Sequence, residues 1–222
     1  MKFYSQYGQD EYVYTNYFQN QKNGFMVDIG AMCGLRGSNS KFFCDLGWSG
    51  IMLEANPYQK ETLEQNRPEE NWKIINKALV PNEYSGSTVT FCAFPAGAWG
   101  EGLSGIFDYY DFGHLNRIKH ETKQGLIKKI PTNFDIEAIK TADLFKDLDQ
   151  VDFLSLDTEG GEYNILQSID YDNTLIKTIA VENNYHSFLF KSFLETKNYK
   201  LVTRLGCDEI YVNRQFLKEL NK

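Results

Sequence analysis

The fold prediction rests on Phe25-Met-Val-Asp-Ile-Gly30, an apolar run that ends at a glycine. Such a run is typical of a strand that is buried on both faces of a parallel sheet. The chain continues through Ala31-Met-Cys-Gly34 into a helical pattern over residues 38–46. The sequence therefore predicts a strand, a glycine turn and a helix, which is how an open α/β sheet begins.

The same alternation recurs along the chain. We expect strands at residues 50–54, 72–76, 87–93, 151–157 and 177–182, and helices at 57–67 and 162–168. Two further strands, 199–205 and 209–212, are separated by Gly206-Cys207-Asp208, which is too short for a parallel crossover. The prediction is a Rossmann-like α/β fold with a mostly parallel sheet, helices on both faces and an antiparallel C-terminal hairpin.

Residues 94–137 contain glycines, aromatic residues and charges without a steady period. A stretch of that length within a compact domain is usually functional. We expect one domain over residues 1–222, in which 94–137 is an insertion that covers the substrate. Aromatic residues of this cover are candidate contacts for a sugar ring: Trp99, Phe107, Tyr109, Tyr110 and Phe112.

Composition excludes several classes of partner. The formal net charge is -7 and no long Lys/Arg block occurs, so a nucleic acid would be repelled. Neither a leader peptide nor a membrane-length apolar run is apparent, which predicts a cytoplasmic protein without a membrane span. The four cysteines lack zinc-ligand spacing and are expected to be reduced.

A cofactor site is expected where the strands end. Asp28, Gly30 and Gly34 surround the first turn, and Glu54 ends the second strand 54 − 30 = 24 residues after Gly30. An acid at that spacing accepts hydrogen bonds from ribose hydroxyls. A dinucleotide fingerprint would require glycine at position 32, which is Met32 here, so S-adenosylmethionine is favoured over a nicotinamide cofactor.

The chain resembles the FkbM family of class I methyltransferases over nearly its whole length. The resemblance is carried by Ser5-Gln-Tyr-Gly-Gln9-Asp10, Val27-Asp-Ile-Gly-Ala31, Ser38-Asn39-Ser40, Gly47-Trp48-Ser-Gly50, Glu54-Ala-Asn56-Pro57, Leu103-Ser-Gly105, Asp152-Phe-Leu-Ser-Leu-Asp157-Thr-Glu159-Gly160 with Glu162, and Val181-Glu182. Two features depart from the family: Ala55, where proline is more common, and the Met32-Cys33 pair within the turn.

The resemblance implies a seven-stranded sheet with a reversed last hairpin and methyl transfer from S-adenosylmethionine to a hydroxyl of a sugar or natural product. By position, Asp28, Gly30 and Gly34 would line the methionine part, Glu54 the ribose, and Asn56 and Ala78 the adenine. Asp157 would face the methionine end. The matching motifs add Gln6, Gln9, Ala31, Ser38 and Asn39 to the predicted cofactor-binding residues.

A hydroxyl acceptor needs help to lose its proton. The candidate bases are Asp157, Glu159, Glu162, Glu182, His114, His120 and His186, of which Asp157, Glu159, His114 and His186 are the predicted catalytic residues. A helix-start role is an equal possibility for Glu162. Alternatively, Asp157, Glu182 and Asn183 would bind a divalent cation such as Mg²⁺.

The predicted function is an O-methyltransferase in glycan biosynthesis, with a small-molecule or glycan acceptor. Two alternatives stay open at this point: a nicotinamide-dependent oxidoreductase and a non-catalytic S-adenosylmethionine-binding module. Formation of a homo-oligomer is also left open.

Overall fold

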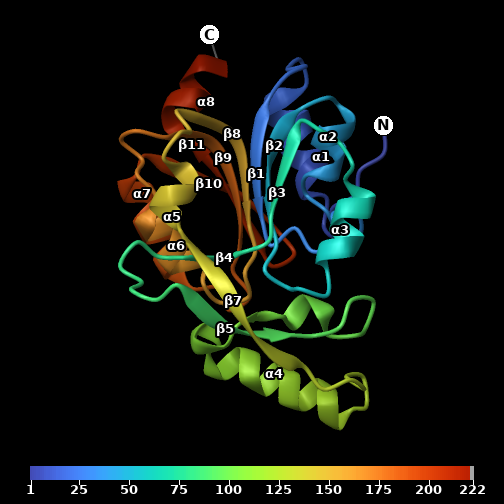
Figure 1. Cartoon of the computed structure of the whole chain (residues 1–222). Helices are drawn as coiled ribbons and strands as arrows, with labels where there is room; N and C mark the ends of the chain where they lie inside the picture. The colour runs from blue at the N-terminus through green and yellow to red at the C-terminus, as the bar shows by residue number, and fades with distance from the viewer. Residues whose placement is uncertain (221–222) are drawn as a thin grey trace.

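A computed structural model describes residues 1–220 of the chain. Its centre is a seven-stranded sheet (Figure 1). In spatial order the strands are β10 (Tyr199–Leu205), β11 (Asp208–Asn213), β9 (Leu175–Glu182), β8 (Gln150–Leu156), β1 (Phe25–Ile29), β2 (Ser49–Leu53) and β3 (Trp72–Ile75).

Parallel pairing joins β3, β2, β1, β8 and β9, whereas β11 is antiparallel to both β9 and β10. The prediction of a mostly parallel sheet with an antiparallel C-terminal hairpin is therefore confirmed. Strand order reverses between β1 and β8, since β2 and β3 extend to one side and β9 to the other. Ligands of open α/β sheets bind at such a switch point, beyond the carboxyl ends of the strands.

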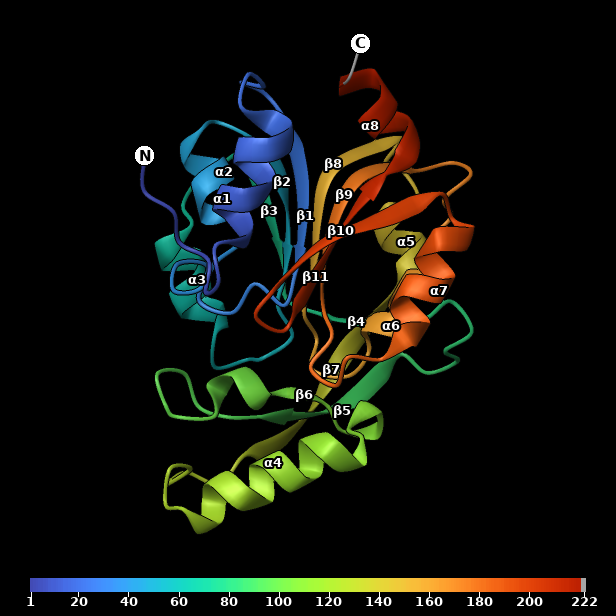
Figure 2. The ribbon, with the colours of Figure 1, turned by 180° about the vertical axis from the view of Figure 1, so that it is seen from behind.

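Helices cover both faces of this sheet, as predicted (Figures 1 and 2). One face packs against α5 (Thr141–Phe145), α6 (Glu162–Ser168) and α7 (Phe188–Thr196). The other packs against α1 (Gln9–Val13) with its π-helical continuation Tyr14–Phe18, α2 (Lys41–Asp45), α3 (Lys60–Asn66) and α8 (Arg214–Leu220). Successive side chains of β1 point to opposite faces of the sheet and pack into two apolar cores. Met26 belongs to one core, and Val27 and Ile29 belong to the other.

Residues 94–137 are more ordered in secondary structure than their sequence indicated. Together with its neighbours this stretch forms a four-stranded sheet in the order β4 (Ala78–Val80), β7 (Thr132–Lys140), β5 (Thr88–Ala93) and β6 (Gly105–Ile106). Helix α4 (Phe112–Lys123) and two short 3₁₀ turns, Glu101–Leu103 and Phe107–Tyr109, complete it. Figure 1 shows this small sheet and α4 beyond the carboxyl ends of the main strands.

Two signals for this small sheet were present in the sequence: the predicted strand at residues 87–93, which is β5, and an alternation along β7. Phe134, Ile136 and Ala138 alternate with polar residues, and all three pack into the apolar core of the small sheet. The remaining strands of this sheet pair across long intervals of chain, which no local period reveals. Among residues 1–220, no helix is both long enough and apolar enough to span a bilayer.

Truncating Phe153→Ala should destabilise the fold by roughly 3–5 kcal/mol, the usual cost of removing a large buried aromatic side chain. Phe153 lies on β8, is fully buried and contacts the ring of Phe43 at a centroid distance of 5.4 Å. Urea unfolding followed by circular dichroism measures the change. The matched control is Phe112→Ala, which removes a ring that is 81% exposed and should change stability by less than about 0.5 kcal/mol. Equal midpoints for the two variants would contradict this assignment of the core.

Candidate active site

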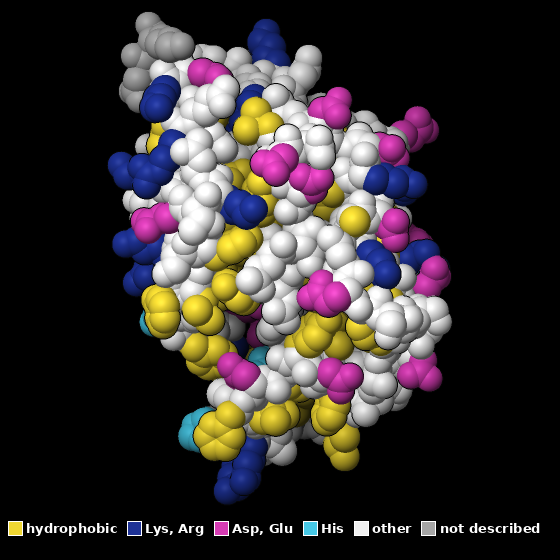
Figure 3. Space-filling model, turned by 90° about the vertical axis from the view of Figure 1, so that its left-hand side faces the viewer, with side chains coloured by type: hydrophobic (Ala, Val, Ile, Leu, Met, Phe, Trp, Pro, Cys, Tyr) yellow, Lys and Arg dark blue, Asp and Glu magenta, His cyan; other side chains and the backbone are white. Residues whose placement is uncertain are grey.

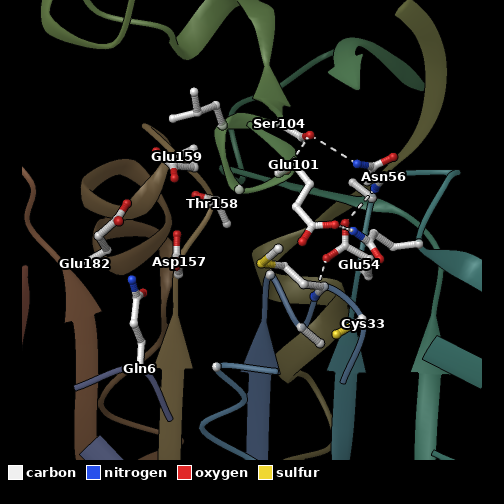
Figure 4. A pocket seen from close by; sticks show the side chains of 18 of the residues that line it. Gln6, Cys33, Glu54, Asn56, Glu101, Ser104, Asp157, Thr158, Glu159 and Glu182 are labelled. Carbon is white, nitrogen blue, oxygen red and sulfur yellow. Dashed lines mark hydrogen bonds between the residues drawn. The ribbon is translucent and has the colours of Figure 1, made fainter. Parts of the chain in front are cut away.

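A cavity of about 830 Å³ lies at the switch point, between the carboxyl ends of the main strands and the small sheet (Figure 4). This volume falls within the range of roughly 300–1,000 Å³ that is usual for small-molecule sites. Most predicted cofactor residues line it: Gln6, Asp28, Gly30, Ala31, Ser38, Asn39, Glu54, Asn56, Ala78 and Asp157.

The turn after β1 forms the floor of the cavity. Gly30 has φ +86°, and a Cβ placed there would lie 1.7 Å from the carbonyl oxygen of Asp157. Two hydrogen bonds fix this contact: the Gly30 N–H donates to the Leu53 carbonyl (2.9 Å), and the Asp157 N–H donates to the Ile29 carbonyl (3.0 Å). Glycine is required at this position because both the backbone conformation and the close approach exclude a side chain.

Gly34, which was predicted to line the cofactor site, packs against other side chains instead. Its φ is +69°, but a Cβ there would meet the side chains of Leu63 and Arg67 at 2.5 and 2.6 Å. The residue therefore faces α3 and does not line the cavity. The requirement for glycine at position 34 comes from helix packing beneath the turn.

Glu54 is the best-defined polar residue of the cavity. It is 5% exposed, and its two carboxylate oxygens accept the N–H groups of Met32 (2.6 Å) and Asn56 (2.7 Å). Burial raises the pKa of Glu54 to about 7, against the lowering effect of these backbone hydrogen bonds. Each oxygen keeps a further lone pair, so the carboxylate is able to accept the two hydroxyls of a ribose.

Two side-chain amides of the cavity have buried oxygen atoms that accept no hydrogen bond. Asn39 donates to the Ser155 hydroxyl (3.0 Å) and Gln59 donates to Glu101 (3.1 Å), which fixes the orientation of both amides. Asn39 Oδ1 and Gln59 Oε1 are buried and have no hydrogen-bond partner, although both residues line the cavity. Unsatisfied buried acceptors are costly, so a ligand with several donors fits here.

Asp28 adds a carboxylate to the same end of the cavity. It is 4% exposed, and burial raises its pKa while the Ser40 hydroxyl and the Arg67 guanidinium oppose the shift. S-adenosylmethionine carries an ammonium group and ribose hydroxyls, all of which donate hydrogen bonds. These donors match the acceptor oxygens of Asp28, Asn39 and Glu54. The residues present therefore fit this cofactor.

The side chain of Asn56, which was predicted near the adenine and lines the cavity, holds the small sheet against β2. Its Nδ2 donates to the Phe94 carbonyl (3.0 Å) and to the Ser104 hydroxyl (3.1 Å), and its Oδ1 accepts the Tyr58 N–H (3.0 Å). Ser104 also accepts the Phe94 N–H at 3.0 Å. Asn56 thus fixes the height of the small sheet above the cavity.

A second tie across the cavity is made by Glu101, which sequence reasoning did not single out. Its carboxylate accepts hydrogen bonds from Arg36 (2.6 Å) in the loop after β1, from Gln59 (3.1 Å) and from the Gly97 N–H (2.5 Å). Nothing local in the sequence marks Glu101. Ser104, in contrast, lies in the motif Leu103-Ser-Gly105 that carried part of the family resemblance.

Three carboxylates converge at the other end of the cavity, where β8 and β9 end (Figure 4). Oxygen atoms of Asp157, Glu159 and Glu182 lie within 4.8 Å of one another. Burial and mutual repulsion raise the pKa values of Asp157 and Glu182 well above the usual range of carboxyl groups. Cys207, a free cysteine, donates its S–H toward Glu182 at 3.7 Å and was not predicted to lie here.

The predicted metal ligands are corrected at one position. Asn183 is buried, but its amide donates to the Ser187 carbonyl (3.0 Å) and accepts the Ser187 N–H (2.8 Å), which closes the loop after β9. Its side chain is therefore already satisfied away from the carboxylates. Glu159 takes the third place in the cluster with Asp157 and Glu182.

His114 is buried on α4 and does not line the large cavity. Its Nε2 lies 3.1 Å from the Leu103 carbonyl, its Nδ1 lies 3.3 Å from Glu159 Oε2, and its ring contacts Tyr110 at 4.1 Å. His114 therefore positions Glu159, and any effect of His114 on the reaction passes through Glu159. The other histidines lie away from the carboxylates, since His186 is exposed on the loop after β9 and His120 is exposed on α4.

Three more predicted residues have structural partners. Gln9 is buried outside the cavity, donates to Asp208 (2.7 Å) and accepts the Tyr7 N–H (2.8 Å). The Ser38 hydroxyl accepts the Lys41 N–H (3.1 Å) at the start of α2. Glu162 accepts the N–H groups of Thr158 and Gly160 (2.7 and 3.1 Å), which is the helix-start role.

An open α/β sheet with this strand order, a glycine turn after its first strand and a buried acid after its second strand are features of S-adenosylmethionine-dependent methyltransferases. The chain belongs to the FkbM methyltransferase family, since the sequence model of the methyltransferase FkbM domain matches residues 28–205. The nicotinamide-dependent alternative is thereby set aside. A comparison with curated protein sequences found no match.

Solved structures of similar shape are methyltransferases. Precorrin-6Y C5,15-methyltransferase from Geobacter metallireducens is 14% identical at a TM-score of 0.44, covering 91% of this chain and 85% of that chain. A methyltransferase from Aquifex aeolicus is 8% identical at 0.41, with 91% and 88% covered. A protein from Pyrococcus horikoshii, provisionally assigned as an RNA methyltransferase, is 8% identical at 0.44, with 93% and 81% covered. Similarity at this level carries no argument about the acceptor.

Substituting Gly30→Ala should abolish cofactor binding and destabilise the protein, because the new Cβ would overlap the Asp157 carbonyl. Gly47→Ala is the matched control: Gly47 has φ +91° but nothing within 4 Å of its Cβ position. The control should therefore cost only the conformational strain of about 1–2 kcal/mol. Thermal unfolding and calorimetric titration with S-adenosylmethionine measure both effects. Equal losses in the two variants would refute the close-approach argument.

Cofactor affinity should rise with pH up to about 7 and then level off. The pKa of Glu54 is about 7 in the empty protein, and the ribose hydroxyls bind its ionised form, so binding must release a proton below that pH. We expect the dissociation constant of S-adenosylhomocysteine to fall by up to tenfold per pH unit between pH 5.5 and 7. Calorimetry in buffers of different ionisation enthalpy detects the released proton. In Glu54→Gln the affinity should be weaker, and a pH slope as steep as that of the wild type would exclude Glu54 as its source.

Proposed function

We propose that this chain is an O-methyltransferase that transfers the methyl group of S-adenosylmethionine to a hydroxyl of a small molecule, a sugar or glycan precursor. The observation that carries the proposal is the position of the carboxylate cluster. Asp157, Glu159 and Glu182 lie at one end of the cavity, whereas Glu54 and the buried amides Asn39 and Gln59 lie around its other parts. The carboxylate cluster would thus take up the proton of an acceptor hydroxyl next to the methyl group of the cofactor.

The cofactor supplies a methyl group on a positively charged sulfur. In the chain, Glu54 would hold the ribose hydroxyls, and Asp28 and Asn39 the ammonium group. The cofactor would supply this methyl group to the acceptor oxygen, and the electron pair of the broken carbon–sulfur bond would stay on sulfur. The proton of the acceptor hydroxyl passes to the carboxylate cluster, where Asp157 is the proposed general base and Glu159 and Glu182 share its surroundings.

Burial and the neighbouring carboxylates raise the pKa of Asp157, which makes its ionised form a stronger base toward the acceptor proton. The small sheet assists by covering the cavity, so that water is kept from the reacting atoms. We include this cover, residues 94–137, in a single catalytic domain that spans residues 1–222. Its ties to the main sheet through Asn56, Ser104 and Glu101 support that assignment.

Replacing Asp157→Asn should lower kcat by roughly 10²–10⁴-fold, the usual contribution of a general base. Asp147→Asn changes an exposed carboxyl on the surface and serves as the matched control. Methyl transfer is measured with S-adenosylmethionine carrying a labelled methyl group. A protein that binds the cofactor but transfers no methyl to any tested alcohol would support the non-catalytic binding module instead.

A divalent cation is the second candidate for the same cluster, because three carboxylates within 4.8 Å offer the hard oxygen ligands that Mg²⁺ prefers. Under the general-base proposal, the rate after exhaustive chelation should stay within about twofold of the untreated rate. Loss of activity that Mg²⁺ restores would assign the cluster to a cation, with Glu159 in the place predicted for Asn183.

A further inference from the structure

A smaller cavity of about 200 Å³ reaches the carboxylate cluster from the side of α6 and α7. Glu159, Glu182 and Asn184 line both this cavity and the large one, so the two spaces meet at the cluster. Figure 3 shows a hollow on this face of the molecule, with acidic and histidine side chains inside it and hydrophobic side chains beside it. The cluster is therefore accessible from a direction that the cofactor does not need.

Aromatic rings form the walls of this side cavity: Tyr109, Tyr163, Tyr185 and Phe190. The rings of Tyr163 and Phe190 are packed edge to face with centroids 5.7 Å apart. Tyr185 lies against the start of α4, where a Cβ on Gly113 would come within 2.6 Å of its ring. These rings offer flat apolar surfaces of the kind on which the C–H face of a sugar packs.

Acidic groups supply the polar part of the side cavity. Asp111, Glu159, Glu162 and Glu182 line it together with His114, and its lining within the described residues 1–220 includes no Lys or Arg. Arg117 lines the adjoining large cavity and interacts electrostatically with Glu159 and Glu182. Glu159 Oε2 is buried without a hydrogen-bond partner, although His114 Nδ1 lies 3.3 Å away. Such a lining accepts hydrogen bonds from hydroxyl or ammonium groups and repels phosphate and carboxylate groups.

The volume of the side cavity limits the size of its ligand. At about 200 Å³ the cavity lies below the range of roughly 300–1,000 Å³ that is usual for sites of drug-sized ligands. That is room for one monosaccharide ring and too little for a nucleotide.

We infer that the side cavity is the acceptor site, and that it takes one ring of a neutral or amine-bearing glycoside whose hydroxyl points to the carboxylate cluster. Phosphorylated and nucleotide-linked sugars are excluded by the negative charge of the lining. This inference rests on the proposed function and narrows its substrate class. Tyr185 is the wall residue that tests it best, because it is 51% exposed and can be truncated without opening the core.

The test uses the full chain loaded with S-adenosylhomocysteine. The probes are the methyl glycosides of common hexoses and 2-amino-hexoses, the corresponding sugar 6-phosphates, and UDP-glucose. Binding is measured by saturation-transfer NMR and by calorimetry. We expect at least one neutral or amino glycoside to bind, and its 6-phosphate to bind at least tenfold more weakly.

Tyr185→Ala should weaken binding of that glycoside at least tenfold and leave the affinity for S-adenosylhomocysteine unchanged. Phe188→Ala is the matched control: this ring is 73% exposed, three residues further along the chain, and lines neither cavity. It should bind the glycoside like the wild type. Thermal unfolding verifies that both variants fold.

Three outcomes would overturn the inference: tighter binding of a phosphorylated or nucleotide-linked sugar than of its parent, unchanged glycoside binding in Tyr185→Ala, or no glycoside binding to the loaded protein. Failure of the proposed function is seen separately. In that case calorimetric titration of the wild-type chain, carried out before it is loaded, would show no binding of S-adenosylmethionine or S-adenosylhomocysteine.

Discussion

The structure depends on the contact between the turn after β1 and the end of β8. Parallel pairing of these strands brings the Asp157 N–H to the Ile29 carbonyl, and Gly30 then lies against the Asp157 carbonyl with no space for a side chain. One backbone contact thus sets the distance between the floor of the cofactor cavity and the first carboxylate of the cluster. Methyl transfer requires an in-line arrangement of the reacting atoms, so this distance is the one that the fold has to fix.

The small sheet extends that control to the opposite wall of the cavity. Asn56 and Ser104 hold it at the end of β2, and Glu101 joins it to Arg36 and Gln59. These ties are hydrogen bonds and one ion pair at the rim of a cavity, where partial burial makes them stronger than on an open surface. The cover is therefore positioned by polar contacts, while the main sheet is held by its two apolar cores.

Charge divides the site into two ends. At the end near the turn after β1, Glu54 accepts two backbone donors, and the Arg67 guanidinium opposes the raised pKa of Asp28. At the other end, three carboxylates lie together, and burial and mutual repulsion raise the pKa values of Asp157 and Glu182. Carboxylates attract a positively charged sulfur. They also accept a hydrogen bond from an acceptor hydroxyl that must release its proton.

Sequence alone determined the parallel core, the C-terminal hairpin, the family and the Gly30–Glu54 pair, because buried strands and turn glycines leave local patterns in the chain. It also placed Asp157, Glu159 and Glu182 among the candidate groups. Tertiary structure alone decided which side chains face the cavity: it turned Gly34 toward α3, Gln9 toward Asp208 and Asn183 toward Ser187, and it revealed Glu101 and the side cavity. The physical reason is that a side chain's neighbours are set by pairing between segments far apart in the chain, which no local period records.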